Sequence, residues 1–480
     1  MSQAPSRTVV VLAAGEGKRM KSQTPKVLQP LLGRTLLGHV LAVAQAIHTD
    51  RTVVVVGHKA DQVGAFLAEA APEATPVLQA EQNGTGHAVR IALDATAGLT
   101  GTVVVLSGDV PLLRPETVEA LLATHEKAGA AATVLSAEVA EPGGLGRIVR
   151  GADGNLERIV EQKDATEEQR RIREINSGIY AFDAVLLRDA LGKLSTDNAQ
   201  GEEYLTDVFG ILAAQGHPVA IEVAEFAYET LGCNDRAELA RLRVLMRDRV
   251  NEAWMRSGVL ILDPATTWID VTATLEPDAT VDQNSQILGT SSVATGAVIG
   301  PDTTLVDTAV AAGATVLRTH SIGAQIGPSA TVGPYSYLRP GTRLGEKSKI
   351  GGFVEAKNAE LGAGAKVPHL TYVGDATIGA KANIGAGTIF ANYDGVRKSH
   401  TTVGEAAFVG SDTVLIAPVE IGPGAYVAAG SAVQKNVPAG SLGITRAPQR
   451  NVDGWVARAR PGTASADAAA RAADTTPDQE

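Results

Sequence analysis

The feature of the sequence that most constrains its fold is a six-residue period in the C-terminal half. Aliphatic residues recur at this spacing in three runs: Leu275, Val281, Ile287, Val293, Ile299 and Leu305; Ile326, Val332, Leu338, Leu344 and Ile350; and Val403, Val409, Leu415, Ile421, Val427 and Val433. Glycine often follows the aliphatic residue. A period of six fits neither an amphipathic helix nor an alternating strand. It is typical of a solenoid whose short strands each point one aliphatic side chain inward.

Such a solenoid needs about eighteen residues per turn if each turn has three sides, which gives roughly nine coils between Leu275 and Val433. One hexad alone buries too little apolar surface, so neighbouring coils must stack on one another. A glycine-rich β-sandwich with accidental spacing is the alternative, but three separate six-spaced runs argue against it. The sequence therefore predicts a parallel β-helix.

Length and composition limit the remaining possibilities. A chain of 480 residues is expected to form two or three domains. The net charge of −11, without a long Lys/Arg block, argues against nucleic acid as a partner. No apolar run approaches the ~20 residues of a membrane span, and the run at 8–14 is too short for a signal peptide. The single cysteine, Cys233, excludes an internal disulfide and favours a cytoplasmic location.

Residues 7–236 alternate between apolar runs and helical patterns. The runs at 8–12, 52–56, 102–106 and 132–135 predict buried parallel strands, and the patterns at 36–47 and 115–126 predict helices. This is α/β architecture, in which ligands bind beyond the carboxyl ends of the strands. We therefore expect functional residues in the loops that follow the strands.

The first such loop has the sequence LAAGEGKRM at 12–20 and leads to Pro25-Lys26. Glycines let backbone N–H groups approach phosphate, and a following helix adds its positive end. Arg19 and Lys26 can supply charge to a triphosphate. A dinucleotide fingerprint would have a third glycine where Met20 stands. The glycine pair alone also fits a plain strand-to-helix turn, but with these neighbours the loop favours phosphate binding.

Two further strand ends carry polar residues. Gln79 leads into the segment NGTG at 83–86, where an amide and a close backbone can read a nucleobase edge. Asp109 follows the predicted strand 102–106. It fits a helix N-cap or turn residue, and it equally fits a hard oxygen ligand for Mg²⁺ that bridges phosphates.

Carboxylates and amides farther along the chain suit sugar hydroxyls, which both donate and accept hydrogen bonds. The candidates are Gly146, Glu161, Asn176 and Asn234. Taken singly, Asn176 and Asn234 are more typical of turns.

At these positions the sequence resembles a known family. The stretches LAAGEGKRM, TPK, LQAEQNGTGHA, SGDVPLL, GLGRI, IVEQKDA, EINSGIYAF and NAQGEEYLTD resemble the N-terminal domain of the bifunctional GlmU family of N-acetylglucosamine-1-phosphate uridyltransferases. The resemblance implies a Rossmann-like nucleotidyltransferase domain at 1–236. Two positions depart from the family pattern, which often has Thr where Lys18 stands and Tyr where Leu145 stands.

The same resemblance implies roles for individual residues. The loop residues Leu12, Ala13, Ala14 and Gly15, together with Lys26, would hold UTP and the sugar phosphate. Gln79, Gly84 and Thr85 would bind the uridine part, and Gly146, Glu161 and Asn176 the sugar part. Asp109 and Asn234 would hold Mg²⁺.

Residues 237–257 predict one long helix between the domains. Apolar residues at three- and four-residue steps alternate with Arg and Asp, and Gly258 ends the pattern. A coiled-coil dimer helix is the alternative, but two or three heptads are too few to support it. At the other end of the chain, residues 459–480 contain almost no large apolar side chain, so we expect a disordered tail.

Within the predicted β-helix domain, 258–458, polar residues crowd where the hexads break. Arg339 and Lys357 offer two cations for a sugar phosphate. His369 is the one histidine near them, and imidazole is the usual base near neutral pH. An isolated His is more often structural, but Tyr372 and Asn383 also lie within one or two coil lengths of it. The segment 390–402 interrupts the period and should loop out, as binding loops of repeat proteins commonly do.

A second set of motifs resembles the acetyltransferase domain of the same family: YLRPGT, GGFVEAKNA, VPHLTYVGDA, NIGAGTIFANYDG, FVGSDT and Arg446. It implies a left-handed β-helix that forms homotrimers with shared active sites. It also implies that His369 is the general base for acetylation of glucosamine 1-phosphate. Arg339, Lys357, Tyr372 and Asn383 would bind that sugar phosphate. Acetyl-CoA would be bound by Ala386, Asn392, Tyr393, Ser411, Ala429 and Arg446.

The leading hypothesis is a cytoplasmic two-step enzyme that acetylates glucosamine 1-phosphate and then joins N-acetylglucosamine 1-phosphate to UTP. Its product would feed bacterial cell-wall precursors. One alternative is a nucleotidyltransferase whose β-helix only trimerises or regulates it. Another is a non-catalytic scaffold that binds nucleotide sugars. Release of CoA and turnover of UTP distinguish the three.

Overall fold

The computed structural model describes residues 6–96 and 98–474, and the chain divides into two compact units, Met1–Ser329 and Ala330–Glu480. Residues 1–5 of the predicted first domain and 475–480 of the predicted tail lie outside the described residues. Within the described residues, every helix is too short or too polar to cross a membrane.

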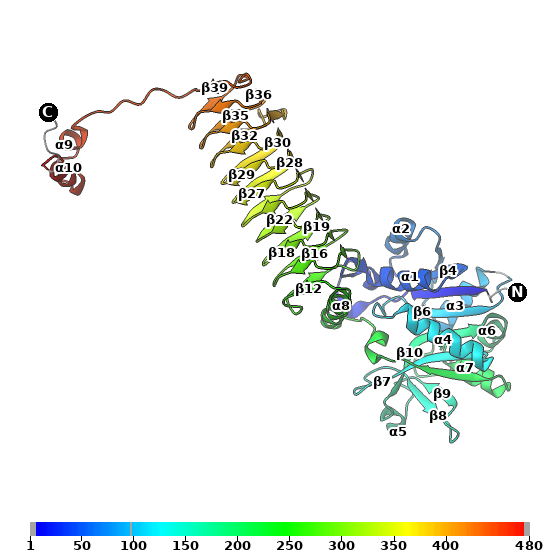
Figure 1. Cartoon of the computed structure of the whole chain (residues 1–480). Coiled ribbons are helices and arrows are strands. Elements are labelled where there is room, and N and C mark those ends of the chain that lie inside the picture. The colour runs from blue at the N-terminus through cyan, green and yellow to red at the C-terminus, as the bar shows by residue number, and fades with distance from the viewer. Residues whose placement is uncertain (1–5, 97, 475–480) are drawn as a thin grey trace. The chain divides into compact units, whose positions relative to one another are not determined.

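The first unit opens with a mixed sheet of nine strands (Figure 1). Its order is β11-β7-β10-β6-β1-β4-β5, and β8 pairs with β10 and β9. The strands are β1 (Arg7–Ala13), β4 (Arg51–Val56), β5 (Thr75–Leu78), β6 (Thr102–Ser107), β7 (Ala132–Glu138), β8 (Arg147–Arg150), β9 (Leu156–Val160), β10 (Glu174–Asp183) and β11 (Val219–Val223). The four predicted strands are confirmed. The unpredicted β10 lies between two of them and runs antiparallel to both β6 and β7.

Helices cover both faces of this sheet. One face packs against α1 (Leu36–Ala46), α2 (Ala60–Ala70) and α4 (Pro115–Ala128), and the other against α3 (Thr85–Asp94), α6 (Ala184–Leu191) and α7 (Asp207–Ala214). Side chains alternate along a strand, so Val9 and Val11 of β1 join the first cluster while Val10 joins the second. Burial on both faces explains why the strands are continuous apolar runs.

The remaining short elements of this part lie in its loops. They are η1 (Lys18–Met20), η2 (Lys26–Leu28), the hairpin β2 (Pro30–Leu31) and β3 (Arg34–Thr35), α5 (Glu167–Arg170) and η3 (Ala227–Thr230). The first loop therefore continues into 3₁₀ turns. The helix that follows this loop is α1, which begins at Leu36, after the hairpin, and confirms the helical pattern predicted at 36–47.

The predicted long helix is α8 (Arg236–Arg256). Asp235 caps its start, because the carboxylate accepts hydrogen bonds from the N–H groups of Ala237 and Glu238. Near its end the buried amide of Asn251 donates hydrogen bonds to the carbonyl oxygens of Pro264 and Thr267, each at 2.9 Å. The helix is thereby fixed to the chain that enters the first coil of the β-helix.

The β-helix is a left-handed stack of three-sided coils, and each strand pairs in parallel with the equivalent strand of the next coil. In the first unit, the first face has β12 (Leu260–Ile261), β15 (Thr280–Val281), β18 (Val298–Ile299) and β21 (Thr315–Val316). The second has β13 (Trp268–Ile269), β16 (Gln286–Leu288), β19 (Thr304–Val306) and β22 (Thr319–Ile322). The third has β14 (Thr274–Leu275), β17 (Ser292–Val293), β20 (Ala309–Val310) and β23 (Gln325–Ile326).

The second unit repeats the pattern. Its first face has β24 (Thr331–Val332), β27 (Lys349–Gly352), β29 (Lys366–His369), β31 (Asn383–Ile384), β34 (Phe408–Val409), β37 (Tyr426–Val427) and β39 (Leu442–Gly443). Its second face has β25 (Ser336–Leu338), β32 (Ile389–Ala391), β35 (Val414–Ile416) and β38 (Ala432–Val433). Its third has β26 (Arg343–Leu344), β33 (Thr401–Val403) and β36 (Val419–Ile421). The long strands β28 (Glu355–Leu361) and β30 (Tyr372–Ile378) turn the corner and serve both of these faces.

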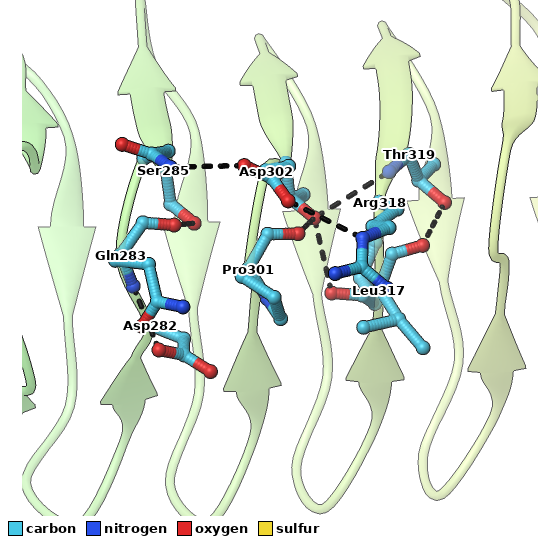
Figure 2. Close-up of polar contacts among 11 residues, drawn as sticks. Asp282, Gln283, Ser285, Pro301, Asp302, Leu317, Arg318 and Thr319 are labelled. Carbon is cyan, nitrogen blue, oxygen red and sulfur yellow. Dashed lines mark hydrogen bonds and ion pairs between the residues drawn. The ribbon is translucent and has the colours of Figure 1, made fainter.

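Hydroxyl groups hold the corners between the first and second faces (Figure 2). The buried hydroxyl of Thr303 donates to the carbonyl oxygen of Val316 in the next coil and accepts from the N–H of Thr319. On the outside, Asp302 accepts hydrogen bonds from Asn284 of the preceding coil at 3.0 Å and from Arg318 of the following coil at 3.2 Å. The Thr303 hydroxyl thereby gives the backbone N–H of Thr319 an acceptor, and Asp302 links the side chains of three successive coils.

The tail differs from the predicted disorder. The predicted tail, 459–480, contains α10 (Ala464–Asp474), and α9 (Trp455–Ala459) ends at its first residue. Almost all of its described side chains are exposed. Alanine has the highest helix propensity, and the α10 sequence ASADAAARAAD is rich in it. Helix formation here follows from local propensity, without the buried core that the disorder argument required.

Candidate functional sites

Predicted residues from five loops line one cavity of about 320 Å³ in the first unit. They come from the end of β1, η2, the end of β5, the start of α3 and the end of β6: Leu12, Ala13, Ala14, Gly15, Lys26, Gln79, Gly84, Thr85 and Asp109. The parallel strands β5, β4, β1 and β6 end at the same edge of the sheet, which brings these loops together.

Two residues of this cavity, Lys26 and Asp109, meet a third polar side chain, Asn234, beside it. The ammonium of Lys26 donates a short hydrogen bond to Asp109 and lies 3.5 Å from the amide oxygen of Asn234. A backbone hydrogen bond holds Asp109 next to the segment of Asn234, since the N–H of Cys233 donates to the carbonyl oxygen of Asp109 at 3.0 Å. Burial and the nearby carboxylate of Asp109 raise the pKa of the Cys233 thiol to about 12, so this thiol stays protonated.

The positive helix end at this cavity belongs to α3, which begins at Thr85. Gly84, at φ +106°, precedes it, and a Cβ there would lie 2.5 Å from the carbonyl oxygen of Glu203. Only glycine fits such a position. The side-chain amide of Gln79 is buried and donates to the carbonyl oxygen of Gly84 at 3.1 Å, which fixes the loop against the base of the cavity.

The predicted sugar-binding residues form a second group. The N–H of Asn176 donates to the carbonyl oxygen of Gly146 at 3.0 Å, and a Cβ on Gly146 would lie 3.5 Å from the carboxylate of Glu161. Glu161 also lines a cavity of about 550 Å³ with Thr206. Burial raises the pKa of Glu161, and the negative charges of Asp207 and Asp164 add to this, whereas a hydrogen bond from Thr206 opposes it.

Two residues of this region were not singled out in the sequence. Ser107 lines the first cavity, and its hydroxyl donates to the carbonyl oxygen of Gly178, two residues after Asn176, which connects the two groups. Gln82 also lines the cavity and donates to the carbonyl oxygen of Ala14 at 2.8 Å. Their place beside Asp109 and Gln79 in strand-end loops was the available signal. The two residues that differ from the family pattern, Lys18 and Leu145, are exposed. Lys18 forms an ion pair with Glu16, and Leu145 is 41% exposed.

In the second unit, cations gather on the second face of the β-helix. Arg339 follows β25 and Lys357 lies in β28, one coil apart, because Leu338 is the register partner of Ala356. The positive charges of Lys398 and then Arg339 lower the pKa of Lys357. Lys398 comes from the predicted loop 390–402 and was not identified from the sequence, although its basic pair with Arg397 was visible there. Glu355 accepts a hydrogen bond from Arg339 at 2.8 Å.

Tyr372 lies on the second face, and its hydroxyl is close to Asn392 of the loop 390–402. A Cβ on Gly374 would lie 2.4 Å from the Tyr372 hydroxyl and 2.7 Å from the side-chain nitrogen of Asn392. Asn392 is buried and donates to Asp375, which also accepts from Asn358. Although burial raises the pKa of Asp375, these hydrogen bonds and the nearby lysines lower it overall. Asp375 thus orients Asn392 as a carboxylate.

His369 ends β29 on the first face, at the corner that leads to Tyr372 on the second face, and its side chain is exposed. Backbone hydrogen bonds link it to the coils that follow: Gly387 donates to His369, Asp412 to Ala386 at 2.8 Å, and Gly430 to Ser411 at 2.8 Å. His369, Ala386 and Ser411 therefore stack on successive coils. Ala429 and Arg446 extend this column, since a Cβ on Gly410 would lie 2.4 Å from the Ala429 nitrogen and one on Gly430 4.0 Å from the Arg446 side chain.

Two of the predicted acetyltransferase residues, Asn383 and Tyr393, lie away from the Arg339 cluster of their own chain. Asn383 is on the first face, where its register partners are Lys366 and Phe408. Tyr393 is 59% exposed at the start of the loop, and its hydroxyl donates to the carbonyl oxygen of Gly395. One chain therefore places the cations on the second face and His369 at the corner that precedes this face, while Asn383 lies on the first face and Tyr393 in the exposed loop.

Comparison with known proteins agrees with this division. Residues 9–250 match the family of MobA-like NTP transferase domains. Over nearly its whole length the chain is similar to curated relatives named Bifunctional protein GlmU. The one from Streptomyces coelicolor is 57% identical over 471 residues, covering 98% of each chain. Those from Streptomyces avermitilis and Corynebacterium efficiens are 56% and 52% identical, and cover 98% and 99% of each chain.

Proposed function

The chain belongs to the GlmU family of bifunctional proteins, and from this membership we propose how its two sites divide the reaction. The protein is a bifunctional transferase that makes UDP-N-acetylglucosamine, a precursor for cell-wall synthesis. We assign acetylation of glucosamine 1-phosphate to the site around His369 in the β-helix. We assign uridylyl transfer from UTP to N-acetylglucosamine 1-phosphate to the site around Lys26 and Asp109 in the α/β part.

In uridylyl transfer, a phosphate oxygen of the sugar phosphate attacks the α-phosphorus of UTP. The new P–O bond forms as the bond to pyrophosphate breaks. The nucleophile is already an anion, so the protein mainly positions the two substrates and neutralises their charge. The 12–15 backbone and Lys26 would hold the triphosphate, and Gln79, Gly84 and Thr85 the uridine. Gly146, Glu161 and Asn176 would hold the sugar.

A divalent metal fits the first site, and we propose Mg²⁺ held by Asp109 and Asn234. The supporting observation is that both side-chain oxygens converge on one cation, the Lys26 ammonium. Within the described residues, no cluster of three or more His, Cys, Asp or Glu could hold a metal alone. Phosphate oxygens and water would therefore complete the coordination, as is usual for Mg²⁺. When bound, the metal would neutralise phosphate charge.

In acetyl transfer, His369 would take a proton from the amine of glucosamine 1-phosphate. The freed nitrogen attacks the thioester carbonyl, a C–N bond forms, and CoA leaves as the C–S bond breaks. Arg339, Lys357, Tyr372 and Asn383 would bind the sugar phosphate. The column Ala386, Ser411, Ala429 and Arg446 spans about 14 Å over three coil steps, which suits the extended arm of acetyl-CoA, with Asn392 and Tyr393 near its reactive end.

We also propose a homotrimer whose active sites are shared between subunits. Asn383 and Tyr393 do not face the Arg339 cluster of their own chain, so a neighbouring subunit would bring them to it. Large apolar side chains are exposed along the corner at Tyr335, Phe353 and Leu370, where they are 57%, 63% and 61% exposed. The rings of Tyr335 and Phe353 stack at 5.3 Å. Exposed apolar patches of this kind mark interfaces, and a second copy of the chain is the proposed occupant.

The remaining proposals concern organisation. We retain the boundaries 1–236, 237–257, 258–458 and 459–480 as functional domains, although the two compact units divide inside the β-helix. We infer a cytoplasmic location from the single buried thiol. We propose that the substrates are small molecules, with neither nucleic acid nor membrane as a partner.

The observation that carries the acetyltransferase assignment is the convergence of Arg339, Lys357 and Lys398 on the second face, which begins at the corner after His369. The test supplies glucosamine 1-phosphate, acetyl-CoA, UTP and Mg²⁺ and follows CoA and pyrophosphate separately. His369→Ala should reduce CoA release by about 100-fold or more and leave pyrophosphate release from N-acetylglucosamine 1-phosphate unchanged. Loss of both activities in a folded trimer would refute the two-site assignment.

A further inference from the structure

A cavity of about 780 Å³ in the first unit lies outside both proposed sites. Its walls are the β2–β3 hairpin, helices α1, α2 and α8, and the first coils of the β-helix. Apolar side chains make up much of the lining, including Leu41, Phe66 and Leu288. The volume falls in the range of about 300–1,000 Å³ that is typical of small-molecule sites.

Two arginines give the cavity a positive rim. Arg34 comes from β3 and Arg243 from α8, and both line the cavity. In the described part of the chain, neither guanidinium has a hydrogen-bond or ion-pair partner. The one acid in the lining, Asp270, accepts a hydrogen bond from the N–H of Gly289 at 2.8 Å. Burial raises the pKa of Asp270, and the positive charge of Arg243 acts against this rise, although the two side chains form no ion pair. Guanidinium groups bind carboxylate and phosphate in a planar, two-pronged manner, so an anionic group complements this rim.

Both arginines belong to elements that lead directly to the uridyltransferase site. Arg34 follows Lys26 by eight positions, and the buried side chain of Gln29 between them donates to the carbonyl oxygen of Thr24 at 3.1 Å. Arg243 lies on α8, whose first residue comes two positions after Asn234. A ligand that binds both Arg34 and Arg243 would therefore change the distance between Lys26 and Asn234.

We propose that this cavity is a regulatory site for a small amphipathic anion. A carboxylate or phosphate group would lie between Arg34 and Arg243, and an apolar body would pack against Leu41 and Phe66. Binding would tie the hairpin to α8 and change the affinity of the uridyltransferase site for UTP. This inference goes beyond the two proposed reactions, neither of which uses the cavity.

The first test measures binding to the full-length protein by fluorescence. The probe is 8-anilinonaphthalene-1-sulfonate, an apolar body with one anionic group. Double substitution Arg34→Gln/Arg243→Gln should weaken one class of sites by about tenfold or more. Arg241→Gln, an exposed arginine of α8 outside the lining, is the matched control and should bind as the wild type does. N-phenyl-1-naphthylamine, an uncharged analogue, should bind the wild type and the double variant alike. Unchanged binding of the sulfonate by the double variant would overturn the proposal.

Competition and kinetics complete the test. Decanoate and decyl phosphate each combine an apolar chain with an anionic group, so each should displace the probe from the wild type. If neither displaces it, the proposed site for an amphipathic anion is contradicted. Saturating probe should change the KM for UTP about fivefold or more in the wild type, and not in the double variant. An unchanged KM in the wild type would refute the regulatory role. Basal activity of the double variant, measured without probe, separates this outcome from failure of the proposed catalytic function.

Discussion

Lys26 and Asp109 form an ion pair inside the first cavity, with side chains only 13% and 21% exposed. Asn234 offers its amide oxygen to the same ammonium at 3.5 Å. Because charge neutralisation is most effective where water is excluded, we expect Asp109→Ala to reduce uridylyl transfer by about 100-fold or more. Pyrophosphate release at several Mg²⁺ concentrations measures the effect. Asp153→Ala, in an exposed turn of the same domain, is the control.

Removal of the metal tests the same site without mutation. Chelation by EDTA should abolish uridylyl transfer and leave acetyl transfer unchanged, since the proposed base in the β-helix is His369. Acetyl transfer that also stops with EDTA, and recovers with Mg²⁺, would contradict the assignment of the metal to Asp109 and Asn234.

The burial of Glu161 predicts a pH-dependent stability. Burial raises its pKa, so the carboxyl group holds its proton more tightly in the native state than in the unfolded chain. The stabilisation is complete below the pKa of the unfolded chain and is lost as pH rises through the higher native pKa. Glu161→Gln should therefore unfold at a higher urea concentration than the wild type at pH 7.5, with a smaller difference at pH 4.5.

The same variant separates stability from binding. Glu161→Gln should raise the KM for N-acetylglucosamine 1-phosphate by about tenfold, because a carboxylate that accepts from sugar hydroxyls is replaced by an amide. Glu157→Gln, 55% exposed on the strand β9 that leads to Glu161, should change neither quantity. A stability difference between Glu161→Gln and wild type that is the same at both pH values would mean that Glu161 does not titrate as described.

Local patterns predicted most of the fold. The six-residue period located the inward-pointing Val281, Ile287 and Ile299, all of which are buried. The α/β part was predicted by its continuous apolar runs. The antiparallel insertion of β10 was missed, because its neighbours β6 and β7 are distant in sequence and no local signal records strand order.

The candidate sites were predicted only in part by chemistry. Loops after parallel strands were expected to meet, and Lys26 and Asp109 do. Ser107 and Lys398 were missed, because their place near Asp109 and beside Arg397 does not by itself show which side chains of other loops and coils they meet. Assigning roles to Asn383 and Ala429 depended on family resemblance, because a side chain on a repeat surface gains meaning only from its neighbours on other coils.

The stacked pair Tyr335 and Phe353 predicts the assembly. A charged side chain at this exposed aromatic corner stays in water in a single chain, so the monomer should fold normally. In a trimer the same charge would be buried, and its desolvation would destabilise the assembly. Phe353→Glu should therefore convert the protein to monomers in light scattering and reduce acetyl transfer with it, while uridylyl transfer persists. Val185→Glu, which replaces another exposed aliphatic side chain on α6, should leave the mass unchanged. A wild-type mass for Phe353→Glu would place the interface elsewhere.

Gly374 predicts how closely the acetyltransferase site is packed. A Cβ at this position would lie 2.4 Å from the Tyr372 hydroxyl and 2.7 Å from the Asn392 side-chain nitrogen. Asn392 is fixed by Asp375, so Tyr372 must move. Gly374→Ala should raise the KM for glucosamine 1-phosphate by about tenfold or more, with uridylyl transfer and trimer mass unchanged. Normal acetyl-transfer kinetics in this variant would mean that Tyr372 does not contact the sugar phosphate, because the hydroxyl cannot keep its place beside an added methyl group.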